Sequence, residues 1–170
     1  GNLAATDEYP DGYLNNWANF VQRFVERYDG DGIEDALCSS KIVIKHYHLV
    51  HELGPIEMDY WQNHRDQYAE VFAITYEAIK KACSDCILYM PVPHISELNQ
   101  GQNFLSDVLG YLKGKNLPDI GFDYHTWSTD LSKPIFDNWK TRGEDYRTSV
   151  EYINRIKELA SKNGFSGSNI

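Results

Sequence analysis

The chain has 170 residues, of which 42% are hydrophobic and 14% are aromatic, and its formal net charge is -9 at pH 7. This length corresponds to one domain that can bury a sizeable core. The acidic balance argues against nucleic acid or an anionic membrane surface as the main partner, because both are bound through clustered Lys and Arg. No apolar run reaches the ~18 residues of a membrane span.

Hydrophobic periodicity predicts that helices and strands alternate along the chain. In chain order we predict a helix over about 14–28, a strand over 42–50, a helix over 59–82, a strand over 86–92, a helix over 104–113, a strand over 120–126 and a helix over 146–162. Such alternation predicts consecutive parallel strands joined by right-handed crossovers, with the helices outside. The sequence therefore favours an α/β fold.

Polar and ionisable residues gather just after each predicted strand. His51 and Glu52 follow the first strand, His94 follows the second, and His125 and Trp127 follow the third. In open α/β sheets and in (β/α)8 barrels, ligands bind at the carboxyl ends of the strands. These five residues are therefore candidates for a binding site. No G-x-G-x-x-G or Walker loop follows a strand, so no nucleotide cofactor is expected.

The three cysteines are Cys38, Cys83 and Cys86, an odd count that excludes a fully paired disulfide framework. Cys83 and Cys86 form one C-x-x-C pair, whereas a structural zinc site usually has two such pairs. The pair also follows a helix, which is not the strand-to-helix setting of a redox motif. We predict small packing residues at a turn.

An acidic run, DGDGIED, begins at Asp29 and alternates in the manner of a calcium-binding loop. The twelve-residue spacing of such a loop fails, because its last position would be Ser40 instead of Glu. A solvated turn between the first helix and the first strand is the preferred interpretation.

The chain resembles the middle of clan A glycoside hydrolases in four segments, which are, in order, NFVQRFVERYDGDGIED, IKHYHLVHELGP, YAEVFAITYEAIKKACSDCIL and IGFDYHTW. The branch that it resembles most is that of the β-xylosidases and α-iduronidases. These enzymes are (β/α)8 barrels, so the resemblance implies a partial (β/α)8 TIM barrel from roughly helix 3 to helix 6, as a single domain over residues 1–170. It also implies a retaining glycosidase that cleaves O-glycosidic bonds.

In this family the fourth strand ends in a Trp-Glu-x-x-Asn-Glu-Pro pattern, whose last glutamate is the general acid/base. By resemblance, Glu52 takes the place of that glutamate. His51 stands where the family has the Asn that contacts the sugar 2-hydroxyl, and Leu53 stands where it has Pro. Without the resemblance, Glu52 would be read as a glutamate at a loop edge facing solvent.

The resemblance assigns sugar contacts to the other strand ends. His125 matches a family histidine near the nucleophile, and Trp127 lies where sugar-stacking aromatic residues occur. Strand alternation puts Asp123 and His125 on one face, as an orienting pair, as ligand contacts or as a structural pair. Trp127 could instead cap the core. With His51 and His94, these residues form the predicted carbohydrate-binding set.

A different chemistry is suggested by His46, His48 and Glu52, which strand alternation places on one face. Their spacing resembles the first metal motif of cupins and could bind a divalent metal. However, cupins are all-β, and the glycines that flank their motif are missing here. We therefore predict no metal; His46 and His48 are expected to fill a barrel interior and pair with polar neighbours.

The resemblance also implies that the barrel is incomplete, because a whole one takes ~250 residues. The family's nucleophilic glutamate would fall beyond Ile170, so these residues alone are expected to lack appreciable glycosidase activity. Unpaired strand edges would favour self-association or association with the missing barrel half. Two alternatives stay open, a non-catalytic carbohydrate-binding or structural relative and a metal-binding protein.

Overall fold

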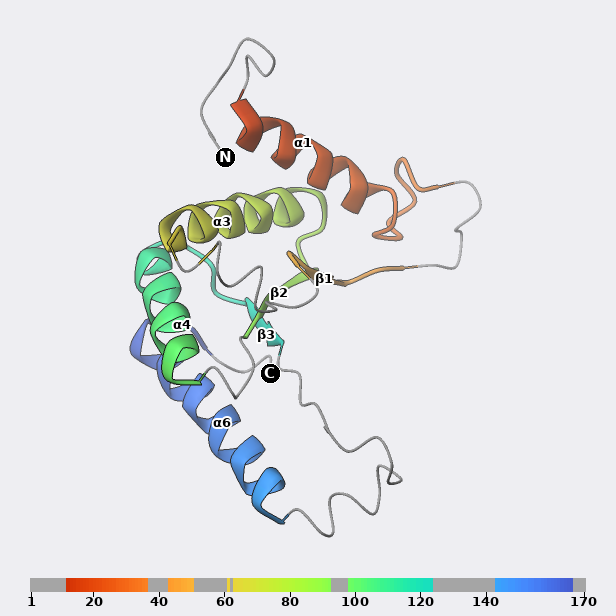
Figure 1. Cartoon of the computed structure of the whole chain (residues 1–170). Coiled ribbons are helices and arrows are strands. Elements are labelled where there is room, and N and C mark those ends of the chain that lie inside the picture. The colour runs from red at the N-terminus through yellow and green to blue at the C-terminus, as the bar shows by residue number, and fades with distance from the viewer. Residues whose placement is uncertain are drawn as a thin grey trace, which may run out of the picture.

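The computed structural model of the chain describes residues 12–36, 43–50, 61, 63–92, 98–123 and 143–166. Within these residues, helices and strands alternate in the order α1, β1, α3, β2, α4, β3 and α6. Figure 1 shows the four helices in an arc around three short strands.

The three strands are β1 (His46–His48), β2 (Ile87–Pro91) and β3 (Gly121–Asp123). They form one sheet in the order β1-β2-β3, and both neighbouring pairs are parallel. Tyr47 lies opposite Leu88, and Met90 lies opposite Phe122. The predicted parallel pairing of consecutive strands is confirmed.

Strand β1 is shorter than the predicted strand over 42–50, which begins with an apolar run. Ile44 lies in that run, but its N–H donates to the carbonyl of Tyr28 at 2.8 Å, which is in the segment after α1. Bonding to β2 starts only at Lys45, whose carbonyl accepts the N–H of Ile87 at 2.8 Å. The end of the third predicted strand, 124–126, lies outside the described residues.

The expected partial (β/α)8 TIM barrel is wrong. The described strands form an open three-stranded sheet, whereas a barrel needs a closed ring of eight tilted strands. Bulky branched side chains fill a barrel interior in layers. Here one face of the sheet carries His46, His48, Tyr89 and Asp123, and the His48 side chain is 40% exposed. The described architecture is a small parallel sheet packed against helices.

All four predicted helices are present, with shifted ends. Their bounds are α1 (Gly12–Glu26), α3 (Arg65–Ala82), α4 (Leu98–Leu112) and α6 (Gly143–Lys162). A turn precedes α3, in which the N–H of His64 donates to the carbonyl of Trp61 at 3.0 Å. Helix α4 begins at Leu98, before the predicted start at 104, and its first turns contain Asn, Gln and Gly residues. Each of these costs only ~1 kcal/mol or less in a helix.

The core lies between the helices and the other face of the sheet. The largest fully buried side chains are Tyr68, Phe72 and Ile79 of α3, Leu88 and Met90 of β2, Phe104, Leu109 and Leu112 of α4, Ile120, Phe122 of β3 and Ile156 of α6. Helix α1 packs on α3, where the indole N–H of Trp17 donates to the hydroxyl of Thr75 at 2.8 Å. Val25 of α1 is fully buried.

Candidate functional site

Strand β1 places its two histidines on one face, as alternation predicted. His46 and His48 are exposed, while Tyr47 between them packs against the core. Burial and the charge of Asp29 raise the pKa of Tyr47 to about 12. The Tyr47 hydroxyl therefore stays protonated and donates to the carbonyl of Ile44 at 3.1 Å, which fixes the strand beneath the histidines.

Tyr89 of β2 lies at the centre of the polar face. Its ring stacks on that of His48, with centroids 5.2 Å apart and 15° between the planes. Its hydroxyl lies 3.1 Å from Nδ1 of His46. The ring rests over Gly121 of β3, where a Cβ would come within 2.4 Å of the ring atom Cδ1. A glycine at position 121 is therefore what allows the tyrosine to lie flat between the two histidines.

Asp123 completes this cluster from β3. One of its carboxylate oxygens, Oδ2, lies 3.2 Å from Nδ1 of His48, and its side chain is 21% exposed. Asp123 is the last residue of β3. We name the four residues His46, His48, Tyr89 and Asp123 the sheet-edge cluster.

Of the predicted site residues, His51, Glu52, His94, His125 and Trp127 lie outside the described residues. The structure therefore describes only the strands that lead to them. The sequence did not point to Tyr89 or to the pairing of His48 with Asp123. The sequence did contain part of this information, because alternation along three parallel strands puts these positions on one face. Their contacts depend on the register of the strands, which alternation does not give.

The alternative metal set stays a prediction, because its third residue, Glu52, lies outside the described residues. His46 and His48 are engaged by Tyr89 and Asp123. Within the described part of the chain, neither histidine belongs to a group of metal-ligating side chains close enough to hold an ion. The pairing with polar neighbours that we predicted is confirmed, on an exposed face instead of in a barrel.

The interpretation of Cys83 and Cys86 as separate packing residues is wrong, because they form a disulfide. The N–H of Cys86 donates to the carbonyl of Cys83 at 3.3 Å in the turn between α3 and β2. This turn brings the two Cα atoms to 5.4 Å, within the range that a disulfide spans. The residues are 3% and 0% exposed, so the bond is shielded from other thiols. Cys38 lies outside the described residues.

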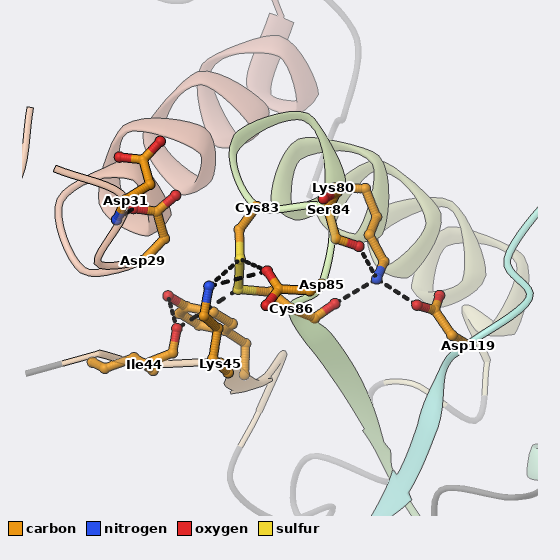
Figure 2. The surroundings of a disulfide bond; sticks show 11 residues. Asp29, Asp31, Ile44, Lys45, Lys80, Cys83, Ser84, Asp85, Cys86 and Asp119 are labelled. Atoms are coloured by element: carbon orange, nitrogen blue, oxygen red, sulfur yellow. Dashed lines mark hydrogen bonds and ion pairs between the residues drawn. A yellow bond between two sulfur atoms is a disulfide. The ribbon is translucent and has the colours of Figure 1, made fainter. Parts of the chain in front are cut away.

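Lys45 approaches this disulfide from the segment before β1, as Figure 2 shows. Its ammonium lies 3.5 Å from Sγ of Cys83 and 3.0 Å from Oδ1 of Asp85. The hydrogen bond from Lys45 lowers the pKa of Asp85. Cys83, Asp85 and Cys86 lie close enough to share a metal ion, but the sulfurs are bonded to each other and offer no thiolate.

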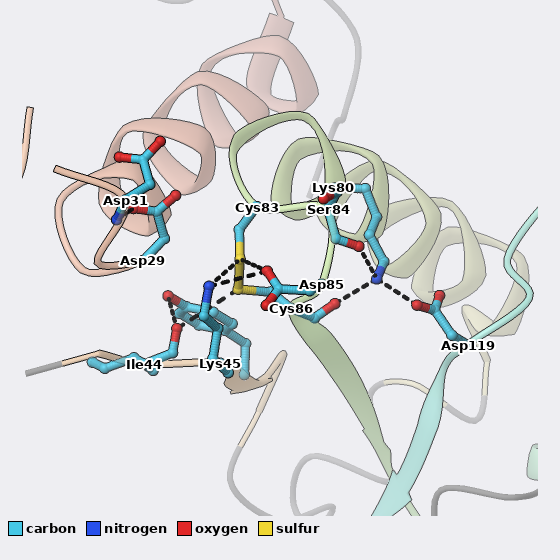
Figure 3. Close-up of polar contacts among 11 residues, drawn as sticks. Asp29, Asp31, Ile44, Lys45, Lys80, Cys83, Ser84, Asp85, Cys86 and Asp119 are labelled. Carbon is cyan, nitrogen blue, oxygen red and sulfur yellow. Dashed lines mark hydrogen bonds and ion pairs between the residues drawn. A yellow bond between two sulfur atoms is a disulfide. The ribbon is translucent and has the colours of Figure 1, made fainter. Parts of the chain in front are cut away.

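Lys80 holds the same turn from the other side (Figure 3). Its ammonium donates to the carbonyls of Ser84 at 3.0 Å and Cys86 at 2.5 Å, and to the carboxylate of Asp119 at 2.5 Å. Burial alone would raise the pKa of Asp119, but hydrogen bonds from Lys80 and Tyr76 outweigh it and lower this pKa. The disulfide and both lysines serve to hold the turn that precedes β2, at the amino ends of β1 and β2.

The acidic run after α1 forms a turn, in agreement with the preferred interpretation, but it is not fully solvated. Asp29 is only 3% exposed and accepts the N–H of Asp31 at 3.2 Å. Asp31 and Asp35 accept backbone N–H groups of the same loop. Burial and then the charges of four surrounding carboxylates raise the pKa of Glu26. The carboxylates thus satisfy the loop backbone at the expense of mutual repulsion.

The chain matches no family model, no curated protein and no solved structure. The resemblance to clan A glycoside hydrolases therefore stays a prediction. In the described residues, no helix combines the length and the apolar character that crossing a bilayer requires.

Proposed function

We propose that this protein binds a carbohydrate at the carboxyl edge of its parallel sheet and that Glu52 acts there as the general acid/base of a retaining glycoside hydrolase. The observation that carries the proposal is the sheet-edge cluster. Three neighbouring strands contribute an imidazole, a phenol and a carboxylate to one face, and such convergence of polar groups is typical of a ligand site at this edge.

The chemistry of the cluster suits sugar hydroxyl groups. The His48–Asp123 pair offers both a donor and acceptors within one hydrogen-bonded unit, and each hydroxyl of a sugar both donates and accepts. The pair is 40% and 21% exposed, so a ligand can reach it without unfolding the sheet. The His46–Tyr89 contact offers a second such unit on the same face.

The proposed catalytic group follows the cluster in sequence. Glu52 comes four residues after His48, and His125 comes two residues after Asp123. A retaining mechanism needs a second carboxyl group ~5–5.5 Å from the first. By resemblance, Glu52 supplies one of these groups, and we assign no residue to the other role, so the proposal for these 170 residues is sugar binding, with hydrolysis only where a second carboxyl group is supplied.

Binding and catalysis are tested separately. Titration of a panel of oligosaccharides by calorimetry should give an affinity that His48→Ala and Asp123→Asn each weaken by about tenfold or more, since each removes a hydrogen bond to a charged group. Glu52→Gln should leave the affinity within about threefold. In a longer protein that supplies the nucleophile, Glu52→Gln should abolish hydrolysis of aryl glycosides.

Asp85→Asn is the matched control for Asp123→Asn. It makes the same change at an exposed, ion-paired aspartate in the turn that precedes β2. Sugar affinity unchanged by Asp85→Asn and lost with Asp123→Asn would support the proposal. If Asp123→Asn and His48→Ala bind every sugar as the unmodified protein does, the sheet edge is not the site. Binding that persists in a longer protein without any turnover would favour the non-catalytic carbohydrate-binding alternative.

A further inference from the structure

Two buried donors in the first turn of α3 have no acceptor. The Nε–H of Arg65 and the hydroxyl of Tyr68 are both buried, and neither has a hydrogen-bond partner among the described residues. Buried polar groups are almost always paired, and leaving one unpaired costs about 1–3 kcal/mol. Two such donors, three residues apart on one helix, lie on the same face and can serve one acceptor.

The Tyr68 hydroxyl cannot easily turn away to find water. Tyr68 is 0% exposed, and its ring is fixed by edge contacts with Trp61 and Phe104, whose centroids lie 5.3 Å and 5.4 Å away. Phe72 stacks on it from the next turn of the helix. Long side chains in a helix lean toward its N-terminus, so Tyr68 leans over the turn that holds Arg65. Burial also raises the pKa of the Tyr68 phenol, which keeps its proton available for donation.

The guanidinium of Arg65 is paired on one side only. Its Nε–H, on the other side, has no hydrogen-bond partner among the described residues. Its NH1 group pairs with Asp107 of α4, whose side chain is 49% exposed. A guanidinium offers a second, side-on pair of donors that includes Nε, and this geometry matches the two oxygens of a carboxylate. The Arg65 side chain as a whole is 28% exposed, whereas its Nε atom is buried.

The helix terminus itself favours a negative group at this place. Helix α3 has 18 residues and begins at Arg65, and the His64 side chain at its N-cap makes no capping hydrogen bond. The first N–H groups of a helix point outward and carry a partial positive charge. Such termini bind anions when further donors lie beside them, and Arg65 and Tyr68, which carry the two buried donors, both belong to the first turn of α3.

We propose that the first turn of α3 binds the carboxylate group of a small ligand, whose oxygens accept from Nε of Arg65 and from the hydroxyl of Tyr68. A carboxylate fits better than a phosphate dianion. Asp107 already balances the charge of Arg65, and Asp66 lies in the same turn, so each further negative charge is added to a neutral or acidic neighbourhood. A single charge is compatible with the helix terminus, and a second is not.

The test uses acetate as the probe on the 170-residue chain. Thermal unfolding is followed by circular dichroism in sodium acetate and in sodium chloride of equal ionic strength. Binding to the folded state should raise Tm by about 3 °C at a tenfold excess over Kd. Tyr68→Phe should lose this rise and weaken Kd by about tenfold or more. In chloride, the same variant should melt no lower than the unmodified protein, because an unpaired hydroxyl has been removed.

Two further variants separate ligand binding from damage to the fold. Arg65→Lys keeps a positive charge near Asp107 but has no side-on pair of donors, so it should also lose the rise with acetate. Tyr76→Phe is the matched control on the same helix, because its hydroxyl already donates to Asp119 at 2.5 Å. It should lower Tm in both salts and keep the rise with acetate.

Several results would overturn the proposal. One is the absence of any difference between acetate and chloride. Another is a rise with acetate that survives Tyr68→Phe. A third is a lower Tm of Tyr68→Phe in chloride without any effect of acetate, which would show that the hydroxyl is held by a water molecule. A larger rise with phosphate than with acetate would overturn the choice of a singly charged ligand.

Discussion

The two faces of the three-stranded sheet carry residues of opposite kinds, although they alternate along the same strands. On one face, Leu88, Met90 and Phe122 are at most 1% exposed and pack against the helices. On the other, the sheet-edge cluster joins His46, His48, Tyr89 and Asp123 through ring stacking and hydrogen bonds. One face therefore supplies most of the stability of the fold, whereas the other carries polar groups whose contacts are partly exposed.

The largest expected effect comes from the core face. Phe122→Ala should lower the free energy of unfolding by about 3–5 kcal/mol, because it leaves a cavity between the sheet and the helices. Asp123→Asn, at the next residue on the opposite face, should cost less than Phe122→Ala, by about 1 kcal/mol or more, because it leaves no cavity and its pair with His48 is partly exposed. Urea unfolding of both variants measures the difference. Similar losses of unfolding free energy in the two variants would refute the proposed difference between the two faces.

A second, intermediate effect is expected where the polar face is tightly packed. Gly121→Ala places a methyl group 2.4 Å from the ring of Tyr89, so the ring must shift, at a cost of up to about 3 kcal/mol. The double variant Gly121→Ala/Tyr89→Ala should lose less than the sum of the single variants, as a double-mutant cycle would show.

The control for this prediction is Gly110→Ala in α4. An added methyl there meets no atom within 4 Å, so it should stabilise the helix by up to about 1 kcal/mol. Strict additivity at positions 89 and 121 would mean that Tyr89 does not rest on Gly121.

A smaller effect is expected from the disulfide, which lies in the turn that precedes β2, at the amino ends of β1 and β2. Cys83→Ser/Cys86→Ser should lower the free energy of unfolding by about 2 kcal/mol, because the bond closes a loop of only a few residues. Lys45 and Lys80 continue to hold the turn after the bond is lost. The unmodified protein in a phosphine reductant should unfold like the double variant, and a complete loss of the fold in either would contradict this.

The smallest effect concerns pH. The pKa of Asp119 is lowered from its ordinary value of 3.8, so the carboxylate stabilises the folded state above that value and loses this contribution as pH falls through its folded pKa. Its side chain is 40% exposed, which limits the contribution to less than about 1 kcal/mol. Asp119→Asn and Lys80→Met should each flatten the dependence of unfolding free energy on pH below about 4. Lys81→Met, at the adjacent lysine, should leave it unchanged.

Local pattern was enough to predict the helices and the parallel order of the strands, because both follow from periodicity. The strand lengths and the sheet's closure depend on which residues pair across the fold. Ile44 has the sequence of a strand residue, yet it bonds to Tyr28. The disulfide was missed for a related reason: only the tight turn between α3 and β2 brings Cys83 and Cys86 within bonding range, and spacing alone does not specify that turn.

For the sheet-edge cluster, the sequence predicted that the two histidines share a face, but not which residues they contact. Alternation placed His46 and His48 on one face, as found. Tyr89 fits into the sheet-edge cluster because its partner on the neighbouring strand, at position 121, is a glycine. The two positions are 32 residues apart in the sequence. A contact of this kind depends on the register of two strands, which a single sequence does not contain.

The fit of Tyr89 over Gly121 also bears on how this protein can change over evolutionary time. A larger residue at position 121 has to displace the tyrosine ring, and a tyrosine at position 89 meets the same conflict once position 121 carries a side chain. A lineage that loses the ring first and gains the side chain second avoids this cost. The close contact therefore favours one order of substitution at the two positions over the other.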